Sequence, residues 1–249
     1  MNKFIAKFLL PGSKLRHIRF LSSSKDWILE RVGPKDEEEI FNFIDNFFLK
    51  DEPLANSQVF GKHPEITRRV YKNTINQGLS VIAREAHGSK EIIGINLNAR
   101  SNQKSNDEQM EMTKTISDLG YRKLVETVAI IDSEVKLNEK LNQKEIFGLK
   151  LLSVRKKFWA SGLSIDLLQK SIEVAREENF KFGKVICGNE FSKKYAEHFK
   201  MKLVWSEPYK TLLCRGETPP RGFPEAPHNT AYLYSADIND FVLSKSKKN

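Results

Sequence analysis

Apolar residues follow two spacings along this chain, and together they predict a mixed set of strands and helices. Continuous or alternating apolar residues predict strands, and apolar residues three or four positions apart predict helices. The expected strands are 27–32, 79–85, 91–98, 147–154, 182–187, 201–205 and 232–238. The expected helices are 36–50, 64–77, 121–141, 163–178 and 191–199. This order indicates one mixed α/β domain over residues 26–249.

Two segments carry local signals beyond this periodicity. Residues 101–118 are polar and show no period, so we expect a loop or a poorly ordered insertion there. At the start of the first helix, Asp36 and Glu39 have the spacing of a capping box. These side chains are therefore expected to bind the first free backbone N–H groups of that helix.

The first helix is expected to end at an acid–proline step. Its apolar residues from Phe41 to Phe48 fall on one face, and Pro53 disfavours helical backbone at Glu52, so the helix should stop near Lys50. Glu52 then lies on irregular chain beside an aromatic cluster. Two interpretations remain open. The carboxylate is either partly desolvated, with a pKa raised towards that of a general base, or a solvated acid that caps a loop.

A second candidate site lies between the strand 147–154 and the helix 163–178. A helix N-terminus presents unpaired N–H groups and binds anions, and Gly162 with the small Ala160, Ser161 and Ser164 would let a ligand approach the backbone. Three cations, residues 155–157, precede this loop. The segment predicts a phosphate site, although an ordinary strand-to-helix turn would have the same pattern.

Charge and composition narrow the classes of function. The net charge is +9, but residues 1–25 contribute +6 with no acid and the last five contribute +3, so the body is close to neutral and a nucleic-acid partner is not expected. No apolar run is long enough for a membrane span. Cys187 and Cys214 form no close pair, so neither a disulfide framework nor a metal site is expected.

Residues 1–25 differ in composition from the rest of the chain. They combine Lys and Arg with Phe, Ile and Leu and end in three serines, which is typical of a mitochondrial presequence. A disordered basic tail on a cytoplasmic protein has the same composition. Both the cytoplasm and the mitochondrial matrix therefore remain open as the location.

The strand–loop–helix–strand order around residues 147–191 resembles the acetyl-CoA-binding core of the GNAT N-acetyltransferases. The family loop reads Arg/Gln-x-x-Gly-x-Gly/Ala, and Trp159, Gly162 and Ser164 fall on it. The resemblance implies a GNAT fold, with a mixed central sheet flanked by helices, and acetyl-CoA as acyl donor. It also implies a cofactor site made of Leu152, Ser153, Val154, Trp159, Ala160, Ser161, Gly162, Leu163, Ser164 and Asn189.

The segment Phe47-Phe48-Leu49-Lys50-Asp51-Glu52-Pro53-Leu54 looks like the corresponding motif of the insect arylalkylamine N-acetyltransferases, including the dopamine N-acetyltransferases. That resemblance implies Glu52 as the general base, Pro53 as a residue that shapes the site and Ser192 as a catalytic helper. It also implies that His228 borders the substrate. Phe48, next to the base, is the expected contact for an aromatic amine.

The sequence also departs from the family pattern. Trp159 replaces the loop cation, and Ala160 replaces a glycine of the same loop. Gly188 stands where the insect enzymes carry a serine. The tyrosine of many GNAT enzymes falls near Ala196, and the neighbouring Tyr195 is expected to point elsewhere. Two functions stay open. One is a monomeric acetyl-CoA-dependent N-acetyltransferase for a small primary amine, such as dopamine, serotonin or a polyamine. The other is a catalytically weak paralogue that binds CoA, an amine or a protein.

Overall fold

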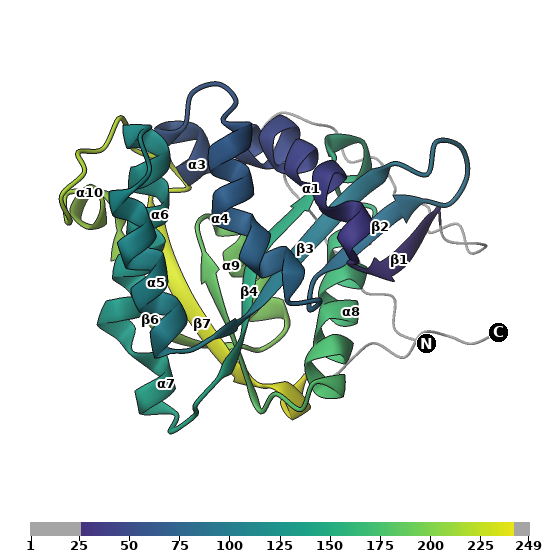
Figure 1. Ribbon diagram of the computed structural model, residues 1–249. Helices are drawn as coiled ribbons and strands as arrows, with labels where there is room; N and C mark the ends of the chain where they lie inside the picture. Colours follow the sequence, from purple (N-terminus) through teal and green to yellow (C-terminus); the bar gives the residue numbers. More distant parts are fainter. Residues whose placement is uncertain (1–25, 242–249) are drawn as a thin grey trace.

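The computed structural model describes residues 26–241, which form a single twisted sheet with helices on both faces (Figure 1). The expected leader, residues 1–25, lies outside this range. The sheet has the strand order β1-β2-β3-β4-β5-β7-β6, and all neighbouring strands are antiparallel except β4 and β5. The strands are β1 Trp27–Arg31, β2 Val81–Glu85, β3 Ile92–Ser101, β4 Ile146–Val154, β5 Phe182–Cys187, β6 Lys202–Pro208 and β7 Thr230–Asp237.

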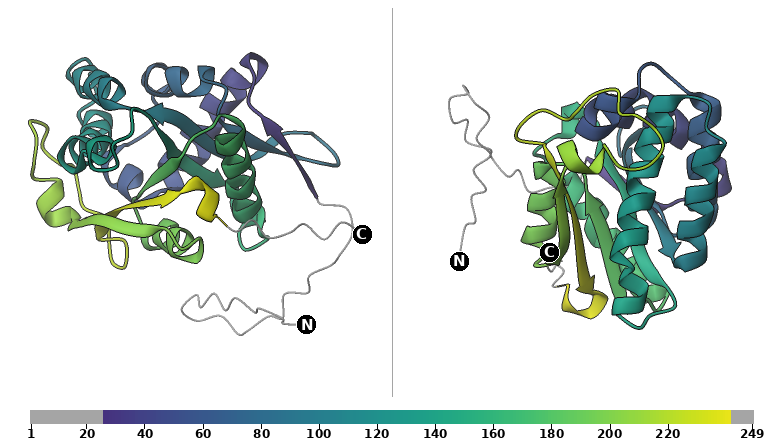
Figure 2. Two further views of the ribbon diagram at one scale, coloured as in Figure 1. Left: turned by 90° about the horizontal axis from the view of Figure 1, so that it is seen from below. Right: turned by 90° about the vertical axis from the view of Figure 1, so that its left-hand side faces the viewer.

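The helices form two layers, one on each face of the sheet (Figure 2). On one face lie α1 Glu37–Phe43, α2 Leu49–Asp51, α3 Pro53–Gln58, α4 Pro64–Asn76, α5 Gln103–Lys114, α6 Leu119–Val135, α7 Leu137–Lys140 and α10 Tyr209–Leu212. On the other face lie α8 Leu163–Glu177 and α9 Glu190–His198. The expected mixed α/β fold with helices flanking a central sheet is confirmed.

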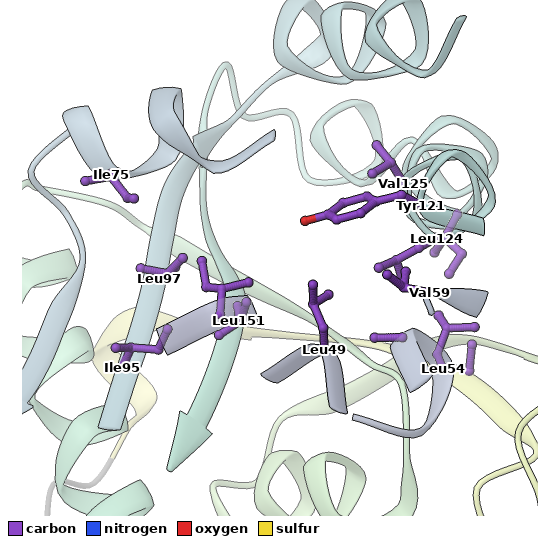
Figure 3. Close-up of a cluster of buried hydrophobic side chains, with 14 of the residues drawn as sticks. Leu49, Leu54, Val59, Ile75, Ile95, Leu97, Tyr121, Leu124, Val125 and Leu151 are labelled. Carbon is purple, nitrogen blue, oxygen red and sulfur yellow. The ribbon is translucent and has the colours of Figure 1, made fainter. Parts of the chain in front are cut away.

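A buried apolar cluster fixes the first helical layer against the sheet (Figure 3). The fully buried Tyr121 of α6 lies among aliphatic residues from α2, α3, β3 and β4, and its hydroxyl reaches Thr67 at 3.1 Å. Thr67 in turn donates to Asp45 at 2.6 Å, so the polar atoms inside this cluster have partners. The packing holds α6 at a fixed distance from the sheet.

The two parallel strands separate part-way along their length. β4 and β5 pair only through Phe147–Gly183, Gly148–Lys184 and Leu149–Val185, although β4 continues to Val154 and β5 to Cys187. Beyond Leu149, the edge of β4 that faces β5 therefore has no strand partner in the described structure. A cavity opens at this split.

Several sequence predictions are wrong in detail. Residues 101–118 are not a loop: α5 occupies 103–114, because Asn102 and Ser105 cap its start reciprocally and its few apolar residues pack against the core. The expected helix 121–141 is divided at Lys136, which has a left-handed backbone (φ 46°). The helices α3 and α10 were not predicted.

The capping box expected at Asp36 and Glu39 is also absent. The Asp36 carboxylate accepts from the Gly33 N–H at 2.9 Å and from Arg84 at 2.7 Å, and Glu39 accepts from the Ile92 N–H at 2.7 Å. The Gly33 bond is a local cap three residues earlier than predicted, and the bonds to Arg84 and to the Ile92 N–H tie the start of α1 to β2 and β3.

Candidate active site

A cavity of about 330 Å³ lies at the split between β4 and β5. It reaches from the helical layer formed by α4, α5 and α6 to the α8 and α9 side of the sheet. Of the residues proposed from sequence, five line it: Phe48, Glu52, Leu152, Asn189 and Ser192. The split therefore brings together the acid–proline motif and the later helix, which are about 140 residues apart in sequence.

The chain before Glu52 carries a helical irregularity. Residues Ile44–Phe48 form a π-helical turn between α1 and α2, a feature that often occurs at functional sites. Glu52 then leaves the helix with extended backbone (φ −82°, ψ 121°), and Pro53 begins α3. The expected end of the aromatic helix near Lys50 is confirmed to within one residue.

Glu52 is at once a helix cap and a desolvated carboxylate. Its Oε2 accepts from the Ala55 N–H at 2.7 Å, and its Oε1 accepts from Asn189 Nδ2 at 3.1 Å. Burial raises the pKa of Glu52 to about 7, although these hydrogen bonds act in the opposite direction. The desolvated interpretation of this acid is therefore the correct one: the carboxylate does act as a cap, but it caps α3 rather than a loop and is not a solvated acid. A carboxyl with this pKa exchanges protons near neutral pH.

Gly188, at the end of β5, allows the carboxylate its position. A Cβ at residue 188 would lie 2.7 Å from Glu52 Oε1 and 3.3 Å from the Tyr209 hydroxyl. That hydroxyl donates to the Gly188 carbonyl at 2.9 Å, which holds the turn against α10. The glycine that appeared as a departure from the family pattern is therefore required by the packing around Glu52.

Asn189 and Ser192 form a reciprocal cap at the start of α9. Asn189 Oδ1 accepts from the Ser192 N–H at 2.9 Å, and Ser192 Oγ donates to the Asn189 carbonyl at 2.9 Å. Because Asn189 Nδ2 is left to bind Glu52, the cap orients this amide towards the carboxylate. The sequence predicts a cofactor contact for Asn189, and the structure places this residue in the cavity lining beside the acid.

The remaining predicted substrate residues differ in their positions. Phe48 lines the cavity, whereas Pro53 and His228 do not belong to its lining. His228 Nδ1 accepts from the Glu190 N–H at 3.3 Å, so the ring caps α9, and burial lowers its pKa. Tyr71 of α4, which the sequence did not suggest, lines the cavity; burial first, and then the charge of Glu52, raise its pKa.

The loop before α8 has the backbone expected of a strand-to-helix turn. Ala160 and Gly162 are left-handed (φ 59° and 94°), and Gly162 caps the helix. The half-exposed Trp159 donates its indole N–H to the Val154 carbonyl at 2.8 Å, and Ser161 Oγ donates to the Phe158 carbonyl. The Leu163 side chain is fully buried in the core, so it offers a ligand only its backbone.

The cations preceding that loop each have an acidic partner. Lys156 binds Asp51 at 2.7 Å, Lys157 lies 3.3 Å from Glu85, and Arg155 binds a glutamate of the hairpin between β2 and β3 at 2.7 Å. These pairs are largely exposed and therefore weak, so phosphate can compete for the same cations.

Tyr195 contradicts the expectation that it points elsewhere. It lines the cavity, and its hydroxyl lies 2.5 Å from Ser164 Oγ at the start of α8. Ser192, Tyr195 and Ala196 stand three and four residues apart, and so they share one face of α9. The tyrosine therefore enters the same cavity as Glu52.

Residues 26–241 show neither a metal-binding cluster nor a membrane-spanning helix. No cluster of His, Cys, Asp or Glu there has the grouping needed to hold a metal ion. No helix in the same range combines the length and the apolar character needed to cross a membrane.

Comparison with solved structures finds many proteins of the same architecture. Mosquito arylalkylamine N-acetyltransferase like 5b superposes with a TM-score of 0.76 at 17% identity, covering 85% of this chain and 99% of the other. Arylalkylamine N-acetyltransferase 2 from Aedes aegypti gives 0.75 at 20% identity, covering 86% and 100%. Drosophila melanogaster polyamine N-acetyltransferase gives 0.72 at 12% identity, covering 85% and 100%.

No family model matches the sequence. The structural likeness nevertheless extends over almost the whole length of the similar chains and includes the mixed seven-stranded sheet. The chain therefore has the fold of the GNAT N-acetyltransferases, as its sequence motifs predicted.

Proposed function

We propose that the protein transfers an acetyl group from acetyl-CoA to a small primary amine, with Glu52 as the general base. The observation that carries the proposal is the pKa of about 7 at a carboxylate that lines the cavity at the split between β4 and β5. The similar structures include arylalkylamine and polyamine N-acetyltransferases, which supports an amine as the acceptor class.

Glu52 would accept a proton from the substrate ammonium, leaving a free amine that attacks the thioester carbonyl. The new N–C bond forms as the C–S bond breaks, and the proton that the nitrogen then loses neutralises the departing thiolate, so CoA leaves as the thiol. Asn189, which donates to Glu52 Oε1, would hold the carboxylate in place during this transfer. Phe48 and Tyr71 supply an apolar wall that keeps the ammonium and the carboxylate away from water.

The donor would bind along the free edge of β4 and at the start of α8. The backbone of Leu152, Ser153 and Val154 lies beyond the last pairing with β5, so this stretch can present backbone groups to a pantetheine chain, except for the Val154 carbonyl, which accepts from Trp159. The left-handed backbone at Ala160 and Gly162 and the N-terminus of α8 fit a pyrophosphate. Trp159 offers an indole there in place of a charge.

The test is a thiol-release assay on the full chain with acetyl-CoA and a panel of arylalkylamines, alkylamines and polyamines. Glu52→Gln keeps the shape of the side chain but removes the base, so turnover should fall at least tenfold while CoA affinity, measured by calorimetry, changes little. Unchanged turnover in this variant would remove Glu52 from the mechanism.

One observation favours a second function. Trp159 replaces the family's loop cation and donates its indole N–H to the Val154 carbonyl, so the donor would lose one charged phosphate contact. A protein that has lost catalysis would then use the cavity to bind a ligand. Absence of both thiol release and CoA binding would support this binding function and overturn the first.

A further inference from the structure

Two lysines line the cavity that contains Glu52. Lys150 belongs to β4 and Lys184 to β5, and we call them the lysine pair. Lys184 Nζ donates to Asp132 Oδ1 at 2.5 Å, and Lys150 Nζ lies 3.5 Å from Asp132 Oδ2. Asp132 comes from α6 and its side chain is 1% exposed. One buried carboxylate thus serves two ammonium groups.

The position of Lys150 results from a β-bulge. Asn98 of β3 pairs with Leu149, and Leu97 pairs with Leu151, which leaves Lys150 as the additional residue. Bulges re-aim side chains and are frequent beside active sites. Gly148 makes room for the lysine stem, because a Cβ at residue 148 would lie 3.3 Å from Lys150 Cε. The backbone of β4 therefore directs this ammonium group towards α6.

The lysine pair carries two positive charges and Asp132 carries one negative charge, so one positive charge has no counter-charge. No second acid lies within 4 Å of either ammonium group in residues 26–241. Burial and the charge of Lys150 lower the pKa of Lys184 to about 8, even though Asp132 acts to raise it. A buried charge without a counter-charge is costly, so the site is suited to accept an anion.

The other cations of the cavity lining are already occupied. Arg100 binds Glu145 at 3.1 Å and Glu178 at 3.0 Å, and Arg69 donates to the Thr115 carbonyl at 2.8 Å. Arg69 is exposed, so water solvates its charge, whereas Lys184 is buried. The buried positive charge without a counter-charge is therefore at the lysine pair.

Aliphatic side chains line the same cavity as the lysine pair. Val128 and Ile131 of α6, Leu151 of β4 and Ile186 of β5 line the same cavity. A ligand with an apolar middle and a negatively charged end would match these surroundings. A polyamine would bring a second positive charge towards two lysines and is disfavoured.

We infer that the lysine pair binds a carboxylate of the acceptor, so that the substrate is an amine whose other end is an acid. This inference rests on the proposed function, because it places the amino group at Glu52 and the carboxylate between Lys150 and Lys184. Alkylamines and arylalkylamines without an acid would leave the positive charge unmatched. An ω-amino acid of suitable length would offer an amino group to Glu52 and a carboxylate to the lysine pair, which line the same cavity.

The test compares matched acceptors on the full chain. With acetyl-CoA, ω-amino acids of four to eight carbons are each paired with the alkylamine of equal carbon number. The best ω-amino acid should have a kcat/KM at least tenfold above that of its alkylamine. Lys184→Met and Lys150→Met should each remove this advantage, and if one of them fails to fold the other still decides. Lys202→Met, which changes an exposed lysine of β6, should preserve it.

Two further experiments, one that changes the acyl donor and one that measures ligand binding without turnover, distinguish the ways in which the inference can fail. In the first, glutaryl-CoA replaces acetyl-CoA as the donor. If the wild type turns over glutaryl-CoA faster than acetyl-CoA, and Lys184→Met loses this preference, the lysine pair binds a carboxylate of the donor. That result would overturn the assignment of the carboxylate to the acceptor. If plain alkylamines are acetylated and a carboxylate on neither the acceptor nor the donor raises kcat/KM, the inference is overturned and the proposed function stands.

In the second experiment, thermal denaturation measures ligand binding without turnover. If ω-amino acids raise the melting temperature of the wild type but not of Lys184→Met, the anion site is supported even when no acetyl transfer occurs. In that case the proposed function fails and the lysine pair remains a binding site. Equal shifts in both proteins would contradict the inference.

Discussion

Glu52→Gln should stabilise the folded protein above neutral pH while it removes activity. The wild-type carboxyl has a folded pKa of about 7 against an ordinary value of 4.5, because the surrounding protein disfavours its charge. Glutamine has no charge to desolvate, and its amide oxygen can still accept the Ala55 N–H that caps α3. The group that performs the chemistry is therefore expected to cost stability.

The magnitude follows from the pKa. A rise from 4.5 to about 7 corresponds to about 3 kcal/mol of penalty for the folded carboxylate, at 1.36 kcal/mol per pKa unit. Glu52 keeps part of its surface in the cavity, so screening by water reduces the expected effect to about 1–3 kcal/mol. The sign is fixed by linkage. The penalty is absent below the unfolded pKa, grows as pH rises and is complete above the folded pKa.

Urea denaturation at pH 5 and pH 8 measures this effect. At pH 8 the free energy of unfolding of Glu52→Gln should exceed that of the wild type by about 1–3 kcal/mol, and at pH 5 most of the difference should disappear. Glu225→Gln, at an exposed position, should change stability by less than about 0.5 kcal/mol at either pH. A Glu52→Gln protein that is less stable than the wild type at pH 8, or equally shifted at both pH values, would refute the reasoning.

Three other substitutions probe the site. Gly188→Ser would place a Cβ 2.7 Å from Glu52 Oε1, so kcat should fall about tenfold while circular dichroism stays unchanged; wild-type kcat would show that the carboxylate has room. Asn189→Ala removes the cap of α9 and should cost about 1 kcal/mol in urea denaturation; loss of its bond to Glu52 should also raise the apparent pKa of kcat/KM. Trp159→Arg should tighten CoA binding about tenfold in calorimetry and leave pantetheine, which lacks the pyrophosphate, unaffected.

The fold was predictable because its strands and long helices have strong apolar periodicity. The acid–proline step also placed the end of the aromatic helix correctly, since Pro53 restricts the residue before it. The helix α5 was missed because its polar sequence carries almost no period, and its stability comes from the cap at Asn102 and from packing on α6. The divided helix at Lys136 depends on a left-handed residue that no local signal announced.

The site was predictable only as separate motifs. Glu52 and Asn189 were both singled out, but their contact depends on where β4 and β5 separate, which is a property of the whole sheet. Tyr195 was misjudged because its direction depends on how α9 is rotated against α8. The lysine pair depends on a bulge at Lys150, and periodicity along the strand carries no trace of it.

The central claim is that Glu52 removes the proton from the amine, and the pH dependence of kcat/KM tests it most directly. Because kcat/KM reports groups of the free enzyme, the wild type should show a rise with an inflection at an apparent pKa of about 7 that belongs to Glu52. In Glu52→Gln the rate should be at least tenfold lower and this inflection should be lost. An inflection near 7 that persists in the variant would contradict the account and assign the proton transfer to another group.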